Sequence, residues 1–214
     1  MSTAVMVLGH SGSGKSTSIR TLDPKSTFII RALEKPLPIK GWKSNYNAES
    51  KNIMDCDTSY KIVAAMKNIS DKAEHIKSIV IDDAQYVMAN EFMRRSAETG
   101  FNKFSDIGRN MWDILSSMGS LRDDLVVFLL AHTEESDQGI IKMKTIGKML
   151  DDKITCEGMV TIVLRSFCVD GKDYGFYTQN NGRDTTKSPM GMFDALTIPN
   201  DLELVRKAIM AYNE

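Results

Sequence analysis

Residues 9–17 read GHSGSGKST and directly follow the apolar run AVMVL at 4–8. The pattern G-x-x-x-x-G-K-[ST] runs from Gly9 to Ser16, and the helix-compatible stretch STSIRTL comes next. A strand, a glycine-rich loop and a helix in this order are typical of a phosphate-binding loop. Glycines let the backbone curl until successive N–H groups point into one concavity, and the helix adds the positive end of its dipole. This stretch therefore predicts a nucleotide-binding site.

The residue types in the loop indicate which groups they bind. Lys15 is placed to reach the β- and γ-phosphates of ATP, and the Ser16 hydroxyl to hold Mg²⁺, so ATP and Mg²⁺ are the expected cofactors. Gly/Ser-rich turns also match the pattern by chance, but the flanking strand and helix favour nucleotide binding. The expected nucleotide-binding residues are Gly9, His10, Ser11, Gly12, Ser13, Gly14, Lys15, Ser16 and Thr17.

Length and composition narrow the class of protein. A chain of 214 residues fits one α/β domain spanning 1–214. The formal net charge of −1 gives no global basic signal, so any contact with nucleic acid has to use a local patch. Three cysteines without metal-like spacing indicate free thiols in a reducing compartment. The first apolar run is too short for a signal peptide and no stretch is long enough to span a bilayer, so we expect a cytoplasmic protein without membrane contact.

Apolar strands alternate with helical patterns along the chain, which predicts a mostly parallel, doubly wound sheet. The run DDLVVFLLAHTEE at 123–135 is the most continuous apolar stretch, as expected for a strand buried on both faces. Other strands are expected at 26–33, 77–85, 159–167 and 173–180, and helices at 57–69, 84–98, 105–121, 146–154 and 200–212.

Polar residues follow two of these strands, at the edge of the sheet where ligands bind in such folds. Asp82 ends the strand SIVIDD and is placed to hold Mg²⁺ through water while Ser16 coordinates the ion directly. Asp83 can orient or deprotonate the attacking water. A structural alternative is that Asp82 or Asp83 only caps the helix that starts near Ala84. His132 follows the most buried strand and either senses the γ-phosphate or is a structural histidine.

Two basic segments are candidate contacts for single-stranded nucleic acid, in which phosphates pair with lysines and bases stack on rings. One lies within 140–153 and the other within 35–46, where Trp42 and Tyr46 are the expected exposed rings. A solvated loop and helix face is the plainer interpretation of the first. The candidate DNA-binding residues are Lys142, Lys144, Lys148, Lys40 and Lys43, with Lys35 beside the last two.

Five further segments carry a more specific resemblance: KPLP-x-KGW, VIDDAQYVMANEF, HTE, KTIGKMLDDKI and KSPMGMF…NDLELV. Together they resemble small phage ATPases, the Sak-type single-strand annealing proteins, which are also described as a phage AAA-like ATP-binding family. The resemblance covers nearly the whole chain and implies a RecA-like P-loop ATPase core. It also implies a protein of the infected host cell that binds single-stranded DNA and promotes annealing or homologous recombination, often beside a phage single-strand binding protein.

The same resemblance implies roles for particular residues. RecA-like proteins hold ATP between neighbouring subunits, and a basic residue of the neighbour reaches the γ-phosphate. The stretch GRDTTKSP is similar to the strand that carries this residue, which implies a homo-oligomer with Lys187, or else Arg183, acting in trans. RecA proteins also place a water-positioning glutamate after the second strand, where Glu34 lies here, so the catalytic carboxylate stays divided between Glu34 and Asp83. The expected catalytic residues are Lys15, Asp83, Glu34, His132 and Lys187.

Two other functions compete with this one. The first is an ATP-dependent loader or regulator of a replication or packaging protein, without DNA activity of its own; a net charge near zero favours it slightly. The second is a small-molecule kinase, which needs an arginine-rich lid over the donor phosphates. Only lysines follow the strand at 123–135, which disfavours the kinase.

Overall fold

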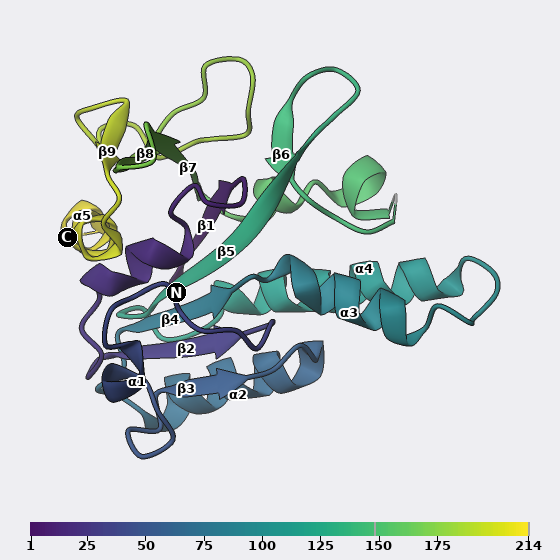
Figure 1. Cartoon of the computed structure of the whole chain (residues 1–214), viewed down its shortest axis with the longest axis horizontal. Helices are drawn as coiled ribbons and strands as arrows, with labels where there is room; N and C mark the ends of the chain where they lie inside the picture. The colour runs from purple at the N-terminus through teal and green to yellow at the C-terminus, as the bar shows by residue number, and fades with distance from the viewer. Residues whose placement is uncertain (148, 214) are drawn as a thin grey trace.

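A mostly parallel sheet forms the centre of this computed structural model, which describes residues 1–147 and 149–213 (Figure 1). In the described part of the chain it has nine strands, in the order β3-β2-β4-β5-β1-β7-β8-β9, with β6 paired to β5. The six strands from β3 to β7 in this order run parallel. The pairs β5–β6, β7–β8 and β8–β9 are antiparallel. The strands are β1 (Thr3–Gly9), β2 (Thr27–Arg31), β3 (Ile53–Asp55), β4 (Ser78–Asp82), β5 (Val126–Glu135), β6 (Ile141–Met143), β7 (Ile162–Val169), β8 (Asp173–Tyr177) and β9 (Thr197–Pro199).

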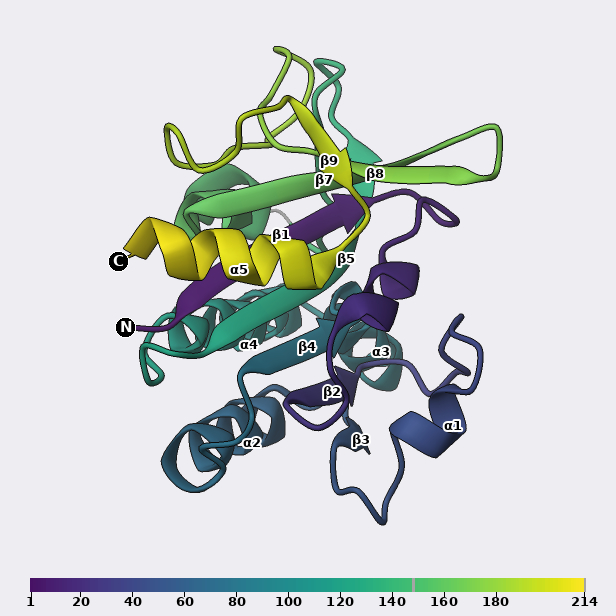
Figure 2. The ribbon, with the colours of Figure 1, turned by 90° about the vertical axis from the view of Figure 1, so that its left-hand side faces the viewer.

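Helices cover both faces of the sheet, so its central strands are buried on both sides. Successive side chains of a strand point to opposite faces, and on β1 Val5 and Val7 enter one core while Met6 and Leu8 enter the other. The first core lies under η1 and α5, and the second lies under α2, α3 and α4 (Figure 2). The helical segments are η1 (Ser16–Thr21), α1 (Trp42–Asn45), α2 (Ser59–Lys72), α3 (Gln85–Arg94), α4 (Asn102–Met118), η2 (Leu150–Ile154), η3 (Cys156–Met159) and α5 (Leu202–Asn213).

This architecture confirms the predicted fold class, an α/β P-loop domain of the RecA-like type with a mostly parallel sheet. The order of the strands decides what meets at the site, because β5 lies between β1, which carries the phosphate loop, and β4, which carries Asp82. The residue after the buried part of β5 therefore lies between the loop and the carboxylates. No helix among the described residues is long and apolar enough to cross a bilayer.

The helix after the phosphate loop differs from the expectation, because η1 is a single 3₁₀ segment of six residues. Its sequence is rich in hydroxyls that bind carbonyls three residues back: Ser18 Oγ donates to Lys15 O at 2.5 Å and Thr21 Oγ1 to Ser18 O at 3.0 Å. These bonds favour the tighter i, i+3 winding.

The region around 140–154 also differs from the prediction of a loop followed by a short helix. Residues Ile141–Met143 form strand β6, which pairs with the end of β5, and the helical turn that follows is a π-type segment at Leu150–Ile154. β5 therefore continues beyond the sheet as one arm of a β5–β6 hairpin (Figure 1). Short elements of three or four residues, namely β3, β9 and α1, were not expected either.

Candidate nucleotide-binding site

The loop after β1 has the backbone shape that phosphate binding requires. Gly12 and Gly14 have φ angles of +79° and +95°, which glycine adopts without strain. Among the described residues, the backbone N–H groups of Ser11, Gly12, Gly14 and Lys15 meet no hydrogen-bond acceptor. Four such donors grouped on one loop fit the oxygens of a phosphate chain.

Lys15 lies folded over this loop and is almost fully buried. Its Nζ donates to the carbonyl oxygens of Gly9 and His10, both at 2.8 Å, and the residue is 5% exposed. Burial lowers the pKa of Lys15 to about 8, although the negative charges of Asp83 and Asp82 act in the opposite direction and favour the protonated form. A desolvated ammonium on a ring of unpaired amides is well placed to bind an anion.

Ser16 and Asp82 meet at the start of η1 and the carboxyl end of β4. The Ser16 hydroxyl donates to Asp82 Oδ1 at 2.7 Å. The pKa of Asp82 is raised to about 6, mainly by burial and to a smaller extent by the negative charge of the neighbouring Asp83. A nearby cation would therefore stabilise the ionised form of Asp82. A hydroxyl and one carboxylate suit Mg²⁺, which keeps several waters and takes few protein ligands. The described residues hold no cluster of three or more acidic, His or Cys side chains that could bind a metal by themselves.

Asp83 is a buried carboxylate held between two basic side chains. Its side chain is 3% exposed, Lys35 Nζ forms an ion pair with its Oδ2, and His132 Nε2 lies 3.6 Å from its Oδ1. Burial opposes ionisation of Asp83, but the contacts with His132 and Lys35 outweigh it and keep the pKa of Asp83 below its usual value. Asp83 is therefore a carboxylate at neutral pH, at the same edge of the sheet as Lys15 and Asp82.

The alternative that these aspartates cap the following helix is wrong. Ala84 holds the cap position of α3, and no side-chain hydrogen bond caps that helix end. Asp83 has a left-handed backbone, with φ of +57°, and this geometry turns its carboxylate toward Lys35 and His132 instead of the first amides of α3.

His132 connects the site to the β5–β6 hairpin. The backbone N–H of His132 donates to Gln85 Oε1 at 3.1 Å, and its backbone carbonyl accepts a hydrogen bond from the backbone N–H of Lys144 at 2.8 Å. On the next residue, Thr133 Oγ1 lies 3.2 Å from His10 Nδ1 of the phosphate loop. A shift at the phosphate loop can therefore reach the hairpin through two adjacent residues of β5.

Two candidate catalytic residues lie outside this cluster. Glu34 is exposed on the loop after β2, and it has no ion pair or side-chain hydrogen bond within the described part of the chain. Lys187 pairs through its backbone with Val163, in the middle of β7. Val163 is the partner of Met6, three residues before Gly9, so the Lys187 backbone lies ~10 Å behind the phosphate loop along the strand. Arg183 is exposed, and its carbonyl accepts a hydrogen bond from Ile141.

The two basic segments have different surroundings. On the hairpin Lys144 is exposed, Lys142 Nζ lies 3.9 Å from Glu134 Oε1, and Lys148 lies outside the described residues. Lys40 and Lys43 are exposed near α1.

The expectation of two exposed rings beside Lys40 and Lys43 is wrong. Tyr46 is 2% exposed and belongs to the core under α5, and burial raises the pKa of its hydroxyl to about 12. Trp42 is half-buried against the same core, with the Arg31 guanidinium 5.1 Å from its ring. Little aromatic surface is therefore left on this segment for stacking.

The structure adds three residues to the walls of the loop that the sequence motif did not indicate. Ser166 Oγ lies 2.6 Å from Ser13 Oγ, and Asn200 Nδ2 donates to Gly14 O at 3.1 Å. A Cβ on Gly14 would lie only 2.5 Å from Tyr174 Cδ1, so glycine is required there for packing as well. These residues come from β7, β8 and the residue after β9, and no local pattern marks them.

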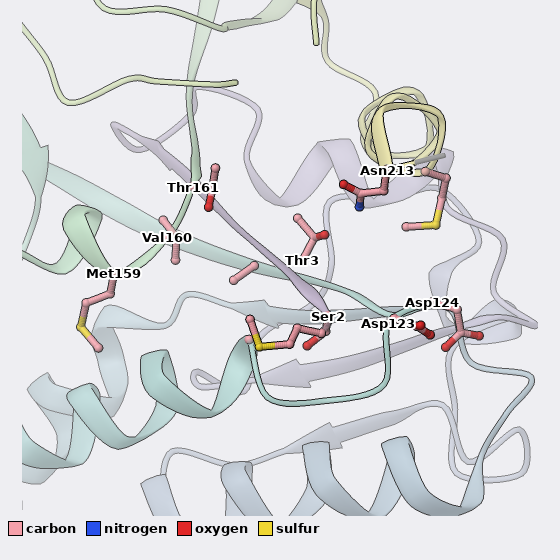
Figure 3. Close-up of a pocket in the computed structure, with 12 residues that line it drawn as sticks. Ser2, Thr3, Asp123, Asp124, Met159, Val160, Thr161 and Asn213 are labelled. Atoms are coloured by element: carbon pink, nitrogen blue, oxygen red, sulfur yellow. The ribbon is translucent and has the colours of Figure 1, made fainter. Parts of the chain in front are cut away.

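A separate cavity of about 750 Å³ lies at the amino ends of the central strands (Figure 3). Ser2, Thr3, Asp123, Asp124 and Thr161 line it, and Asp124 is already paired with Lys77 and Arg122. The phosphate loop is at the opposite ends of the same strands. Ligands of parallel sheets bind at the carboxyl ends, so the size of this cavity does not make it the site.

The glycine-rich loop, the buried lysine and the Ser16–Asp82 pair define a P-loop nucleotide-binding protein. The family model of the AAA domain matches residues 1–190, and the chain belongs to this family. No curated protein matches the sequence. Family and site together indicate nucleotide-binding ATPase activity, for which Mg²⁺ is the usual ion.

Proposed function

We propose that this protein hydrolyses ATP in a cycle coupled to single-stranded DNA, and that it promotes annealing or homologous recombination as the Sak-type phage proteins do. The observation that carries the coupling is the hydrogen bond from the backbone N–H of Lys144 to the backbone carbonyl of His132. It joins the hairpin that carries Lys142 and the exposed Lys144 to the residue beside the buried carboxylate Asp83. DNA bound on the hairpin would then act on the geometry of the nucleotide site.

In the proposed hydrolysis Asp83 is the general base. Its carboxylate accepts a proton from the attacking water, whose oxygen bonds to the γ-phosphorus while the bond to the bridging β-oxygen breaks, giving ADP and phosphate. Burial beside His132 supports this role for Asp83, whereas Glu34 is exposed. Lys15 and the loop amides would hold the phosphates. Mg²⁺ on Ser16 and Asp82 would neutralise charge on the β- and γ-phosphate oxygens.

ATPase rates with and without single-stranded DNA test the proposal. We expect stimulation by DNA, and binding that weakens steeply with salt because phosphate contacts release counterions. Replacing Lys142 and Lys144 with Ala should lower DNA affinity and reduce the salt slope by about one for each phosphate that the variant no longer neutralises. Lys67→Ala, on the exposed side of α2, is the matched control. A slope that stays unchanged would exclude the hairpin and leave Lys40 and Lys43 as candidates.

A rate that is indifferent to DNA would instead select the second candidate function, an ATP-dependent loader or regulator of another protein. The position of Lys142 near Glu134 favours this candidate, because the Glu134 carboxylate partly neutralises the positive charge that Lys142 would offer to DNA.

We also propose a homo-oligomer in which Lys187 reaches the nucleotide of a neighbour. The position of Lys187 behind its own phosphate loop supports a role in trans. The alternative, an exposed edge lysine that deters aggregation, fits less well because Lys187 is half-buried. Lys187→Ala and Lys15→Ala subunits should each be inactive alone, and mixing them should restore part of the ATPase activity. Lys172→Ala, in the exposed β7–β8 turn, should stay active. Full activity of Lys187→Ala alone would contradict the trans role.

A further inference from the structure

Lys35 reaches the nucleotide site from a loop that is otherwise remote from the phosphate-binding motif. It follows β2, and its ammonium forms the ion pair with Asp83. The Lys35 side chain is 40% exposed, in contrast to the buried carboxylate that it contacts. One end of this pair is therefore fixed in the protein, and the other can move into solvent or toward a ligand.

The backbone of Lys35 is held in place by a buried arginine. Arg31 Nη1 donates to the Lys35 carbonyl at 2.6 Å, and Arg31 itself makes a two-pronged contact with the Asp55 carboxylate at 2.6 and 2.8 Å. The Arg31 guanidinium also lies over the ring of Trp42. Because the backbone is anchored at β2 and β3, motion of Lys35 is confined to its flexible four-carbon side chain.

Asp83 cannot act as a base while Lys35 occupies one of its oxygens. An ammonium that neutralises a carboxylate weakens its ability to accept a proton. A bound γ-phosphate carries more negative charge than a single carboxylate and offers three acceptor oxygens, so it competes for the same ammonium. Lys15 is already engaged by the loop carbonyls of Gly9 and His10, which leaves Lys35 as the more mobile of the two cations.

We propose that Lys35 is a second catalytic cation that acts in cis: it leaves Asp83 for the γ-phosphoryl group when nucleotide binds. This transfer frees the Asp83 carboxylate to accept the proton of the attacking water and brings positive charge to the phosphoryl group as it is transferred. The inference rests on the proposed ATPase function and is independent of any role for Lys187 or for DNA.

The test compares binding of Mg²⁺–ADP with binding of Mg²⁺–ADP–aluminium fluoride, which resembles the phosphoryl group in transfer. Lys35→Ala should bind ADP as the wild type does but lose affinity for the fluoride complex by ~10-fold or more, with an ATPase rate lower by about 10³-fold. Lys35→Arg should recover part of both, because it keeps the charge. Lys67→Ala is the matched control and should behave as the wild type.

Three results would overturn the proposal. Unchanged affinity of Lys35→Ala for the fluoride complex would show that Lys35 does not reach the phosphoryl group. A faster ATPase would show that Lys35 only restrains Asp83. Parallel loss of both affinities with a lower melting temperature would show a structural role. Failure of the wild type to bind or hydrolyse ATP would instead reject the proposed function, so the two failures are distinguishable.

Discussion

Replacing Lys15 with Ala should abolish ATP turnover while the protein stays folded. The ammonium is the cation nearest the loop amides, and removal of one such preorganised interaction with charge in a transition state costs ~10²–10³-fold in rate. The fold should survive, because the hydrogen bonds that Lys15 Nζ makes within the described residues go to the loop carbonyls of Gly9 and His10. ATPase rate and the thermal melting temperature are the two measurements.

Lys15→Met, which keeps most of the side-chain volume without the charge, is the matched control for packing. It should be as inactive as Lys15→Ala and at least as stable, since burial of the ammonium is unfavourable, as its lowered pKa shows. Hydrolysis at the wild-type rate by either folded variant would contradict the assignment of the loop.

Asp83→Asn should lower the maximal rate by ~10²–10⁴-fold, the usual contribution of a general base, with little change in nucleotide affinity. Asparagine is the suitable substitution because Asp83 has a left-handed backbone that Asn tolerates and that Ala adopts only with strain. The residual rate should be measured at saturating ATP and Mg²⁺.

Asp82→Asn is the companion variant and should act differently. Its amide cannot replace the charge next to Ser16, so the Mg²⁺ concentration needed for half-maximal activity should rise. Excess Mg²⁺ should therefore rescue Asp82→Asn but not Asp83→Asn. The reverse pattern would exchange the roles of the two aspartates, and Glu34→Gln with a loss as large as that of Asp83→Asn would return the base to Glu34.

Much of this site could be predicted because its signals are local. The loop from Gly9 to Ser16 is recognisable because its motif lies in consecutive residues. The position of Asp82 beside this loop could be predicted because ligands bind at the carboxyl ends of parallel strands. The same rule predicted that His132 lies at this edge of the sheet. The buried strands were recognisable from continuous apolar runs, since helices cover both faces of the sheet.

Short elements and irregular segments were the parts that could not be predicted. Strand β6 has three residues, and its pairing with β5 depends on a contact across the hairpin and not on its own sequence. The exposed or buried state of Tyr46 depends on whether a loop folds back onto the core under α5, which composition does not reveal.

The consecutive residues of the phosphate loop and the alternation of strands and helices were sufficient to predict the P-loop fold and to single out Lys15, Ser16 and Asp82 as candidate site residues. Only the folded chain decided which groups surround them. Ser166 and Asn200 reach the loop from distant strands, and Lys35 belongs by sequence to a basic surface segment. The reason is physical: hydrogen bonds and ion pairs act over a few ångströms, so a long side chain finds its partner only after packing has brought β2 and β4 side by side.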